Sequence, residues 1–175
     1  KNREARVRAA FDVAIVSVLL DAGAGPDWTY RDAATGIVTS RSEGLALASL
    51  RMFEAGVFSS DPHDPLRADA GKLSDFTAAQ LAAGFQVSAG NPLAGLDGRA
   101  ALLARLGKTM AGAPGVFAMA DSARPGGLFN LLAHRSKSIP APDILRALLL
   151  HFGPIWPGRL ALGGMSLGDT WRHPA

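Results

Sequence analysis

The sequence predicts a mainly α, compact helical domain. Apolar residues recur at spacings of three and four in several stretches, which is the period of an amphipathic helix. Serine, threonine or aspartate stands before several of these stretches, where such side chains cap helices, and glycine or proline comes after them. Of 175 residues, 48% are hydrophobic and 19% are charged, so the chain can bury the core of one domain over 1–175.

The first expected helix starts with the chain and ends at Gly23, since Gly25 and Pro26 block its continuation. Between positions 13 and 20 nearly every residue is apolar, which predicts a central helix that its neighbours enclose. Asp12 lies beside this stretch, so its carboxylate must be paired, either as a structural partner or as a functional acid. The residues at helical spacing are Val7, Phe11, Ala14, Ile15, Val18, Leu19 and Ala22.

A capping signal opens the second expected helix. A loop with a turn at Thr35-Gly36 precedes it. Ser40 and Glu43 then fit a capping box, in which the two side chains bond to backbone N–H groups of the first turn. The helix is expected over about 41–57.

The middle of the chain is expected to hold a loop and two more helices. Asp61-Pro62 and Asp64-Pro65 make the stretch after the second helix a loop, because residues before proline avoid helical backbone. Thr77 and Gln80 fit a second capping box, for a short helix. Asp97 is expected to cap a helix over about 98–110.

Glycine and proline punctuate the C-terminal part. Residues 111–124 are expected to connect helices, and further helices are expected near 125–132 and over 143–152. A small β-hairpin is expected near residues 159–168, around a pair of glycines. The elements together predict helices packed into one domain with a hairpin near its end.

Composition argues against several classes of protein. There are 18 Lys and Arg against 15 Asp and Glu, a net charge of +3, so the surface is mixed and nucleic acid is not the expected partner. Cysteine is absent, which excludes disulfides and thiolate chemistry. The longest dense apolar run, 13–20, is shorter than the roughly 20 residues that span a bilayer. With no signal peptide visible, we expect a cytoplasmic protein with no membrane partner, and a piece of a longer chain.

Signals for metals and cofactors are weak. The four histidines are scattered rather than paired on a helix, so no metal site is expected. The Gly-Ala-Gly run at 23–25 comes after a helix and lacks the third glycine of a dinucleotide loop, so no cofactor is expected. Residues 164–168 match the G-x-S-x-G pattern of serine hydrolases. That elbow needs a strand before it and a helix after it, and neither is predicted here.

The densest group of reactive side chains lies near the C-terminal end. Asp169, Trp171, Arg172 and His173 stand within five residues, just after a Gly-rich turn. The carboxylate would stabilise an oxocarbenium-like ribosyl cation or activate water. Trp171 would stack on a planar base, and Arg172 would bind phosphate with two hydrogen bonds. The alternative is a surface turn in which Asp169 caps the residues after it.

Further candidate substrate-binding residues stand in a loop and at helix starts. Trp28 and Tyr30 form an aromatic pair that would either line a pocket or fill the edge of the core. Arg41 and Glu43 begin a helix, where an arginine beside backbone N–H groups would bind an anion or simply belong to the helix start. Arg99 has a similar position in the first turn of its helix.

Long strings of the chain resemble the uracil-catabolism protein 4 family. They are FDVAIVSVLLDAGAGPDWTY, RSEGLALASLRMF, GFQVSAGNPLAGLDGRAALLARLG and GPIWPGRLALGGMSLGDTWRHPA, and the similarity covers nearly the whole chain. Members of that family are longer on both sides, which implies that this chain is a middle portion. The resemblance implies a role in pyrimidine (uracil) catabolism. The implied step is hydrolysis of the N-glycosidic bond of a ribosyl-urea-type intermediate, with or without a phosphate, releasing urea.

The tail is also similar to an Asp-aromatic-Arg-x-Pro segment of queuosine-salvage glycosylases, which are helical enzymes akin to helix-hairpin-helix DNA glycosylases. The aspartate of that segment is catalytic, which implies the same role for Asp169, although Thr170 stands between it and the aromatic Trp171. The resemblance therefore implies an N-ribosyl hydrolase with a nucleoside- or nucleotide-derived substrate. Two alternatives stay open, a non-catalytic partner in a pyrimidine-catabolic complex and a nucleic-acid-binding helix-hairpin-helix module. The oligomeric state is not predicted.

Overall fold

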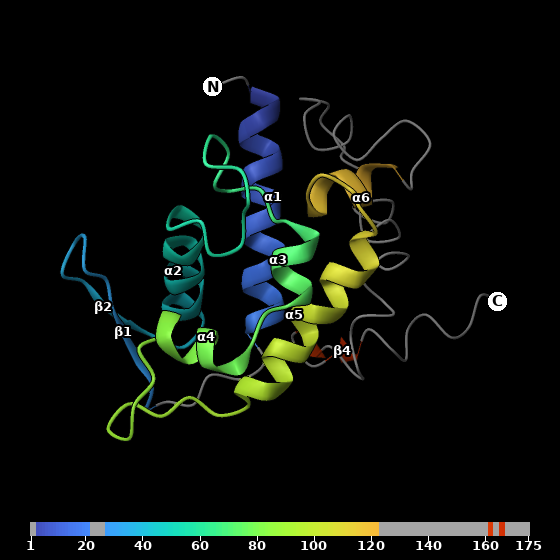
Figure 1. Ribbon diagram of the computed structural model, residues 1–175. Helices are drawn as coiled ribbons and strands as arrows, with labels where there is room; N and C mark the ends of the chain where they lie inside the picture. The colour runs from blue at the N-terminus through green and yellow to red at the C-terminus, as the bar shows by residue number, and fades with distance from the viewer. Residues whose placement is uncertain (1–2, 22–26, 123–160, 163–164, 167–175) are drawn as a thin grey trace.

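Helices make up most of the described part of the molecule. A computed structural model describes residues 3–21, 27–122, 161–162 and 165–166 (Figure 1). The helices are α1 (Arg3–Leu20), α2 (Arg41–Glu54), α3 (Ala70–Ser74), α4 (Ala78–Gly84), α5 (Leu96–Met110) and α6 (Val116–Ser122). The strands are β1 (Thr29–Arg31), β2 (Val38–Ser40), β3 (Ala161–Leu162) and β4 (Met165–Ser166). The predicted mainly α fold is confirmed.

Helix α1 is central in this arrangement. It contacts α2 on one side and α5 and α6 on the other (Figure 1). The prediction that its neighbours enclose it was wrong for one side, because Val18 is 48% exposed and Ala5, Ala10 and Ala14 are exposed too. The nearly continuous apolar run therefore belongs to a helix with two apolar faces, of which the described elements cover one.

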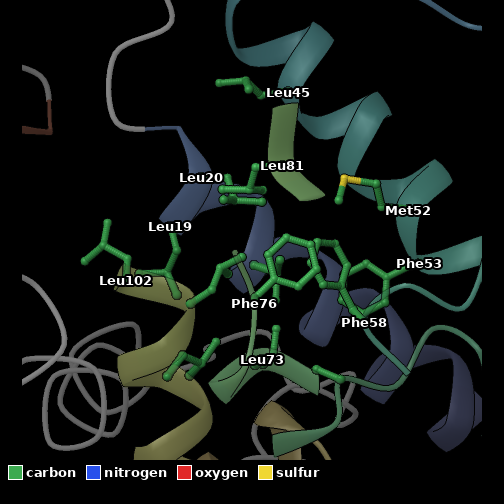
Figure 2. Close-up of a cluster of buried hydrophobic side chains, with 14 of the residues drawn as sticks. Leu19, Leu20, Leu45, Met52, Phe53, Phe58, Leu73, Phe76, Leu81 and Leu102 are labelled. Atoms are coloured by element: carbon green, nitrogen blue, oxygen red, sulfur yellow. The ribbon is translucent and has the colours of Figure 1, made fainter. Parts of the chain in front are cut away.

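The core lies where helices α1 to α6 meet, and Figure 2 shows part of it. The ring of Phe58, just after α2, lies 4.9 Å from that of Phe53 and 5.0 Å from that of Phe76, centroid to centroid. Figure 2 shows leucines of α1, α3 and α4 beside these rings. Burying each such side chain contributes about 1.5–3 kcal/mol, so the rings fix the segment after α2 against the helices.

Strands β1 and β2 form an antiparallel hairpin directly before α2 (Figure 1), where a loop was predicted. Tyr30 pairs with Thr39 across it. The predicted turn is confirmed, since the N–H of Gly36 donates to the carbonyl oxygen of Asp32 at 2.7 Å. Strands of three residues hold too few positions to display a period of two, which is why no strand was predicted here.

Two side-chain amides cover the edge of β1. Gln86 donates to the carbonyl oxygen of Arg31 at 2.8 Å and accepts the N–H of Arg31 at 3.1 Å. Asn91 makes the same pair of bonds with Thr29, both at 2.8 Å. These amides satisfy the backbone groups that a further strand would otherwise bind. They attach the hairpin to the turn that comes after α4.

One of the two predicted capping boxes is present. Thr77 accepts the N–H of Gln80 at 3.3 Å, and Gln80 accepts the N–H of Thr77 at 2.9 Å. Ser40 stands at the N-cap of α2 but makes no side-chain cap bond. The prediction of a box between Ser40 and Glu43 was therefore wrong. The reason is Arg41, whose left-handed backbone with φ of 51° breaks the helical geometry that a capping box needs from its first position.

Helix α5 begins earlier than predicted. Its N-cap is Gly95, with φ of 73°, and Asp97 lies within the first turn. Glycine adopts this left-handed backbone without strain, so the predicted cap at Asp97 was wrong by two positions. The carboxylate of Asp97 still lies near the positive end of the helix dipole.

Helices α3 and α6 fall in segments predicted as a loop and a connector. Asp69 caps α3 by accepting the N–H of Lys72 at 2.9 Å. The start of α6 is held by Asp12, whose carboxylate accepts the N–H of Phe117 at 2.7 Å across 105 residues of sequence. No local pattern can predict a cap that comes from so far along the chain.

The small hairpin predicted near residues 159–168 is confirmed, because Leu162 of β3 pairs with Met165 of β4 in antiparallel register. The helices predicted near 125–132 and over 143–152 lie outside the described residues. Among the helices in the described ranges, none is long and apolar enough to cross a membrane.

Candidate functional site

The predicted catalytic segment lies outside the described part of the chain. Asp169, Trp171 and Arg172 belong to 167–175, so their roles stay predictions. The other predicted site residues are described. Four of them, Trp28, Tyr30, Arg41 and Glu43, belong to the β1–β2 hairpin with its preceding turn and to the first turn of α2, while Arg99 is on α5.

Trp28 is a core residue. It is fully buried, and its indole N–H donates to the carbonyl oxygen of Phe85 at 3.0 Å. A Cβ at position 44 would lie 2.9 Å from the indole ring, so Gly44 is what allows α2 to approach Trp28 this closely. Of the two roles predicted for Trp28, the geometry favours filling the edge of the core, where it fixes the start of α2.

Tyr30 is buried in the hairpin, 5% exposed. Burial raises the pKa of its phenol, and the negative charge of Asp32 adds to the effect, so the side chain stays neutral near pH 7. Asp32 itself is 1% exposed and is held by Arg51 of α2, whose Nε and Nη2 donate to its two oxygens at 2.9 and 2.8 Å. This ion pair joins the hairpin to α2.

Sequence reasoning missed the ion pair between Asp32 and Arg51. The Arg51 guanidinium, followed by the Thr35 hydroxyl, holds the pKa of the Asp32 carboxyl well below its usual range. The Asp-x-x-Thr spacing is a local turn signal, and the Thr35 hydroxyl does donate to Asp32 at 2.7 Å. Arg51 lies 19 residues away, so only the folded chain identifies it as the partner.

Arg41 and Glu43 are exposed on the first turn of α2. Arg41 has φ of 51°, a backbone region that non-glycine residues rarely occupy and that is enriched at functional sites. Ser40 makes no side-chain cap bond to the N–H groups of this turn, and anion binding by these groups and Arg41 stays a prediction.

Arg99 lies in the first turn of α5, as predicted, but its side chain is enclosed. It is 1% exposed, and its Nε donates to the carbonyl oxygen of Ala94 at 3.3 Å. Burial lowers the pKa of the guanidinium, and the charge of Asp21 partly offsets this. Since Asp21 comes directly after α1, Arg99 stabilises the approach of α5 to the end of α1.

Asp12 is paired, as its position required. Its Oδ2 accepts the N–H of Ala68 at 2.9 Å and its Oδ1 accepts that of Phe117 at 2.7 Å. Burial raises the pKa of this carboxyl to about 6, outweighing the opposite effect of the hydrogen bonds. A small cavity of about 110 Å³ adjoins it, lined also by Arg8 and Arg67. The backbone contacts make Asp12 a structural partner of two distant segments.

Two of the predicted binding residues, Arg41 and Glu43, are exposed. The exposed guanidinium of Arg41 and carboxylate of Glu43 suit an anion and hydroxyl groups. Within the described ranges, no three His, Asp or Glu side chains come together as metal ligands would. A carboxylate for the predicted hydrolysis would come from the tail, where Asp169 stands.

The chain matches known proteins along nearly its whole length. The family described as "Protein of unknown function (DUF1688)" matches residues 1–175. "Protein urg3" of Schizosaccharomyces pombe is 44% identical over 165 residues, covering 94% of this chain and 39% of that protein. "Uracil catabolism protein 4" of Lachancea kluyveri is 37% identical over 172 residues, with the same two coverages of 94% and 39%.

These relatives confirm the resemblance that the sequence strings indicated. The chain spans 39% of the length of each curated relative. The match of the family model covers every residue, and the chain belongs to the DUF1688 family.

Proposed function

We propose that this chain is part of a protein of uracil catabolism. The observation that carries the proposal is its 37% identity, over 94% of the chain, to the relative named Uracil catabolism protein 4. Because the chain spans 39% of that relative, the activity proposed here is that of the full-length protein.

The proposed reaction is hydrolysis of the N-glycosidic bond of a ribosyl-urea-type intermediate. The bond between ribose C1′ and a urea nitrogen breaks, its electron pair leaves with the nitrogen, and the nitrogen takes up a proton. The oxygen of a water molecule then adds to C1′ and releases one proton, which balances the proton that the nitrogen takes up. Asp169 would stabilise the developing ribosyl cation or orient the water.

Substrate binding is proposed for the start of α2. The exposed Arg41, beside the N–H groups of the first turn, would bind a 5′-phosphate, and the exposed Glu43 would accept hydrogen bonds from hydroxyl groups. Trp28 supports this turn from the core side, through its contact with Gly44. Trp171 and Arg172 would complete the site from the tail.

The test uses the full-length protein with ribosyl-urea and its 5′-phosphate as substrates. Asp169→Asn keeps the shape of the side chain and removes its charge, so urea release should fall about a hundredfold or more. The midpoint of thermal unfolding should stay unchanged. Asp75→Asn alters an exposed aspartate at the end of α3 and is the matched control, which should keep full turnover.

Two results would contradict the proposal. If Asp169→Asn loses thermal stability and activity together, the aspartate is a structural residue. If the well-folded protein binds neither substrate and releases no urea, the non-catalytic partner of a pyrimidine-catabolic complex becomes the better description.

A further inference from the structure

An apolar groove of about 940 Å³ lies along the open side of α1. Small side chains of α1 form one wall, among them Ala5, Ala10 and Ala14, and Leu47 and Leu50 of α2 contribute to the other. From position 5 to 18 the α1 wall is roughly 20 Å long, at 1.5 Å a residue. Such a groove matches three to four turns of a helix, and small wall residues allow a helix to approach closely.

The groove exposes more apolar surface than an isolated side chain would. Val18, which lines it, is 48% exposed, and the alanines at 5, 10 and 14 are also exposed. A contiguous apolar surface of this kind marks an interaction site more often than it marks free surface.

We propose that the groove binds an amphipathic helix from the part of the full-length protein that lies outside these 175 residues. The curated relatives are much longer, since the chain covers 39% of each, so the same polypeptide supplies a large source of such helices. A segment of the same chain binds at high effective concentration and loses little association entropy. The helix would place small or aliphatic residues against α1.

The polar groups of the groove lie near the start of α1, where Asp64 also adjoins Ala5 and Ala9. Arg6 lies near one end of the α1 wall, and the loop after α2 contributes His63 and Asp64. A helix whose apolar stripe is flanked by charged residues would meet these groups at the rim, where they remain hydrated. This proposal is independent of the reaction proposed above.

The test measures access to the groove in the full-length protein. Ala14→Cys and Val18→Cys place thiols in the groove, and Ala79→Cys places one on the exposed face of α4. This chain has no cysteine of its own, and labelling of the unsubstituted protein gives the background. Maleimide should react at least about tenfold more slowly with the groove thiols than with the control, and urea should remove the difference. Equal rates in the folded protein would overturn the proposal.

A photo-cross-linker attached to the thiol at position 18 identifies the occupant. A cross-link to a peptide of the same polypeptide beyond these 175 residues is the expected result. A cross-link between two copies, or to a peptide of the 175 residues that does not line the groove, would overturn the proposal. If circular dichroism shows that Ala14→Cys disturbs folding, Ala10→Cys replaces it, because Ala10 also lines the groove and is exposed.

Discussion

The carboxylate of Asp12 connects three segments of the chain. Because it is buried, its contribution to stability depends on pH. It accepts backbone N–H groups from Ala68 and Phe117 while being 1% exposed. Burial raises the pKa of Asp12 from 3.8 to about 6, so the folded state holds a proton that the unfolded state has lost between these values. Stability from this group is therefore full below about pH 4 and falls as pH rises through about 6.

We predict that Asp12→Asn removes this part of the pH dependence. Asparagine does not titrate, so the free energy of unfolding of Asp12→Asn, relative to that of the unchanged protein, should rise by about 2 kcal/mol between pH 4 and pH 7. Urea denaturation at several pH values measures it. Asp75→Asn, at an exposed site, is the control and should match the unchanged protein. The prediction is contradicted if the free energy of unfolding changes with pH in the same way for Asp12→Asn and for the unchanged protein.

At the scale of elements, the sequence predicts the helix starts and caps that depend only on residues close together in the chain. The box between Thr77 and Gln80 forms as its spacing predicts. The capping box that the spacing predicts at the start of α2 does not form, because the backbone of Arg41 is left-handed. The start of α6 depends on Asp12, 105 residues earlier. Local patterns thus identify the longer helices, while caps and short helices that depend on distant partners have to be read from the folded chain.

Helices α3 and α5 pack so closely that position 107 requires glycine. A Cβ there would lie 2.5 Å from the carbonyl oxygen of Ala70 and 2.5 Å from the nitrogen of Ser74, and backbone atoms cannot move aside as a side chain can. Gly107→Ala should therefore lower the free energy of unfolding by about 1–3 kcal/mol, measured by urea denaturation.

The control for that prediction is Gly98→Ala in the same helix. Nothing lies within 4 Å of the added Cβ at Gly98, so alanine should raise the free energy of unfolding by up to about 1 kcal/mol through its helix propensity. If both variants change stability equally, contact with α3 is not what excludes a side chain at Gly107.

At the scale of the whole molecule, the sequence indicates candidate residues but not which of them share a surface. Trp28 and Arg99 looked like binding groups, yet both are enclosed, because an indole and a guanidinium in a folded core can bond to backbone carbonyl groups. Arg41 and Glu43 remain exposed. The proposed site therefore depends on whether the start of α2 and the tail bind the same substrate.

We predict that Arg41 and Arg172 bind one phosphate together in the full-length protein. Arg41→Gln and Arg172→Gln should each raise the KM for the 5′-phosphate of ribosyl-urea about tenfold, the effect of losing one charge-assisted hydrogen bond. Neither should change the KM for ribosyl-urea itself.

Because both side chains would bind the same group, the double variant should raise KM by less than the product of the two single effects. Arg105→Gln, an exposed arginine of α5, is the control for net charge and should change neither KM. An equal rise in KM for both substrates would mean that the two arginines do not recognise the phosphate, and a fully multiplicative double variant would mean that they act at separate places.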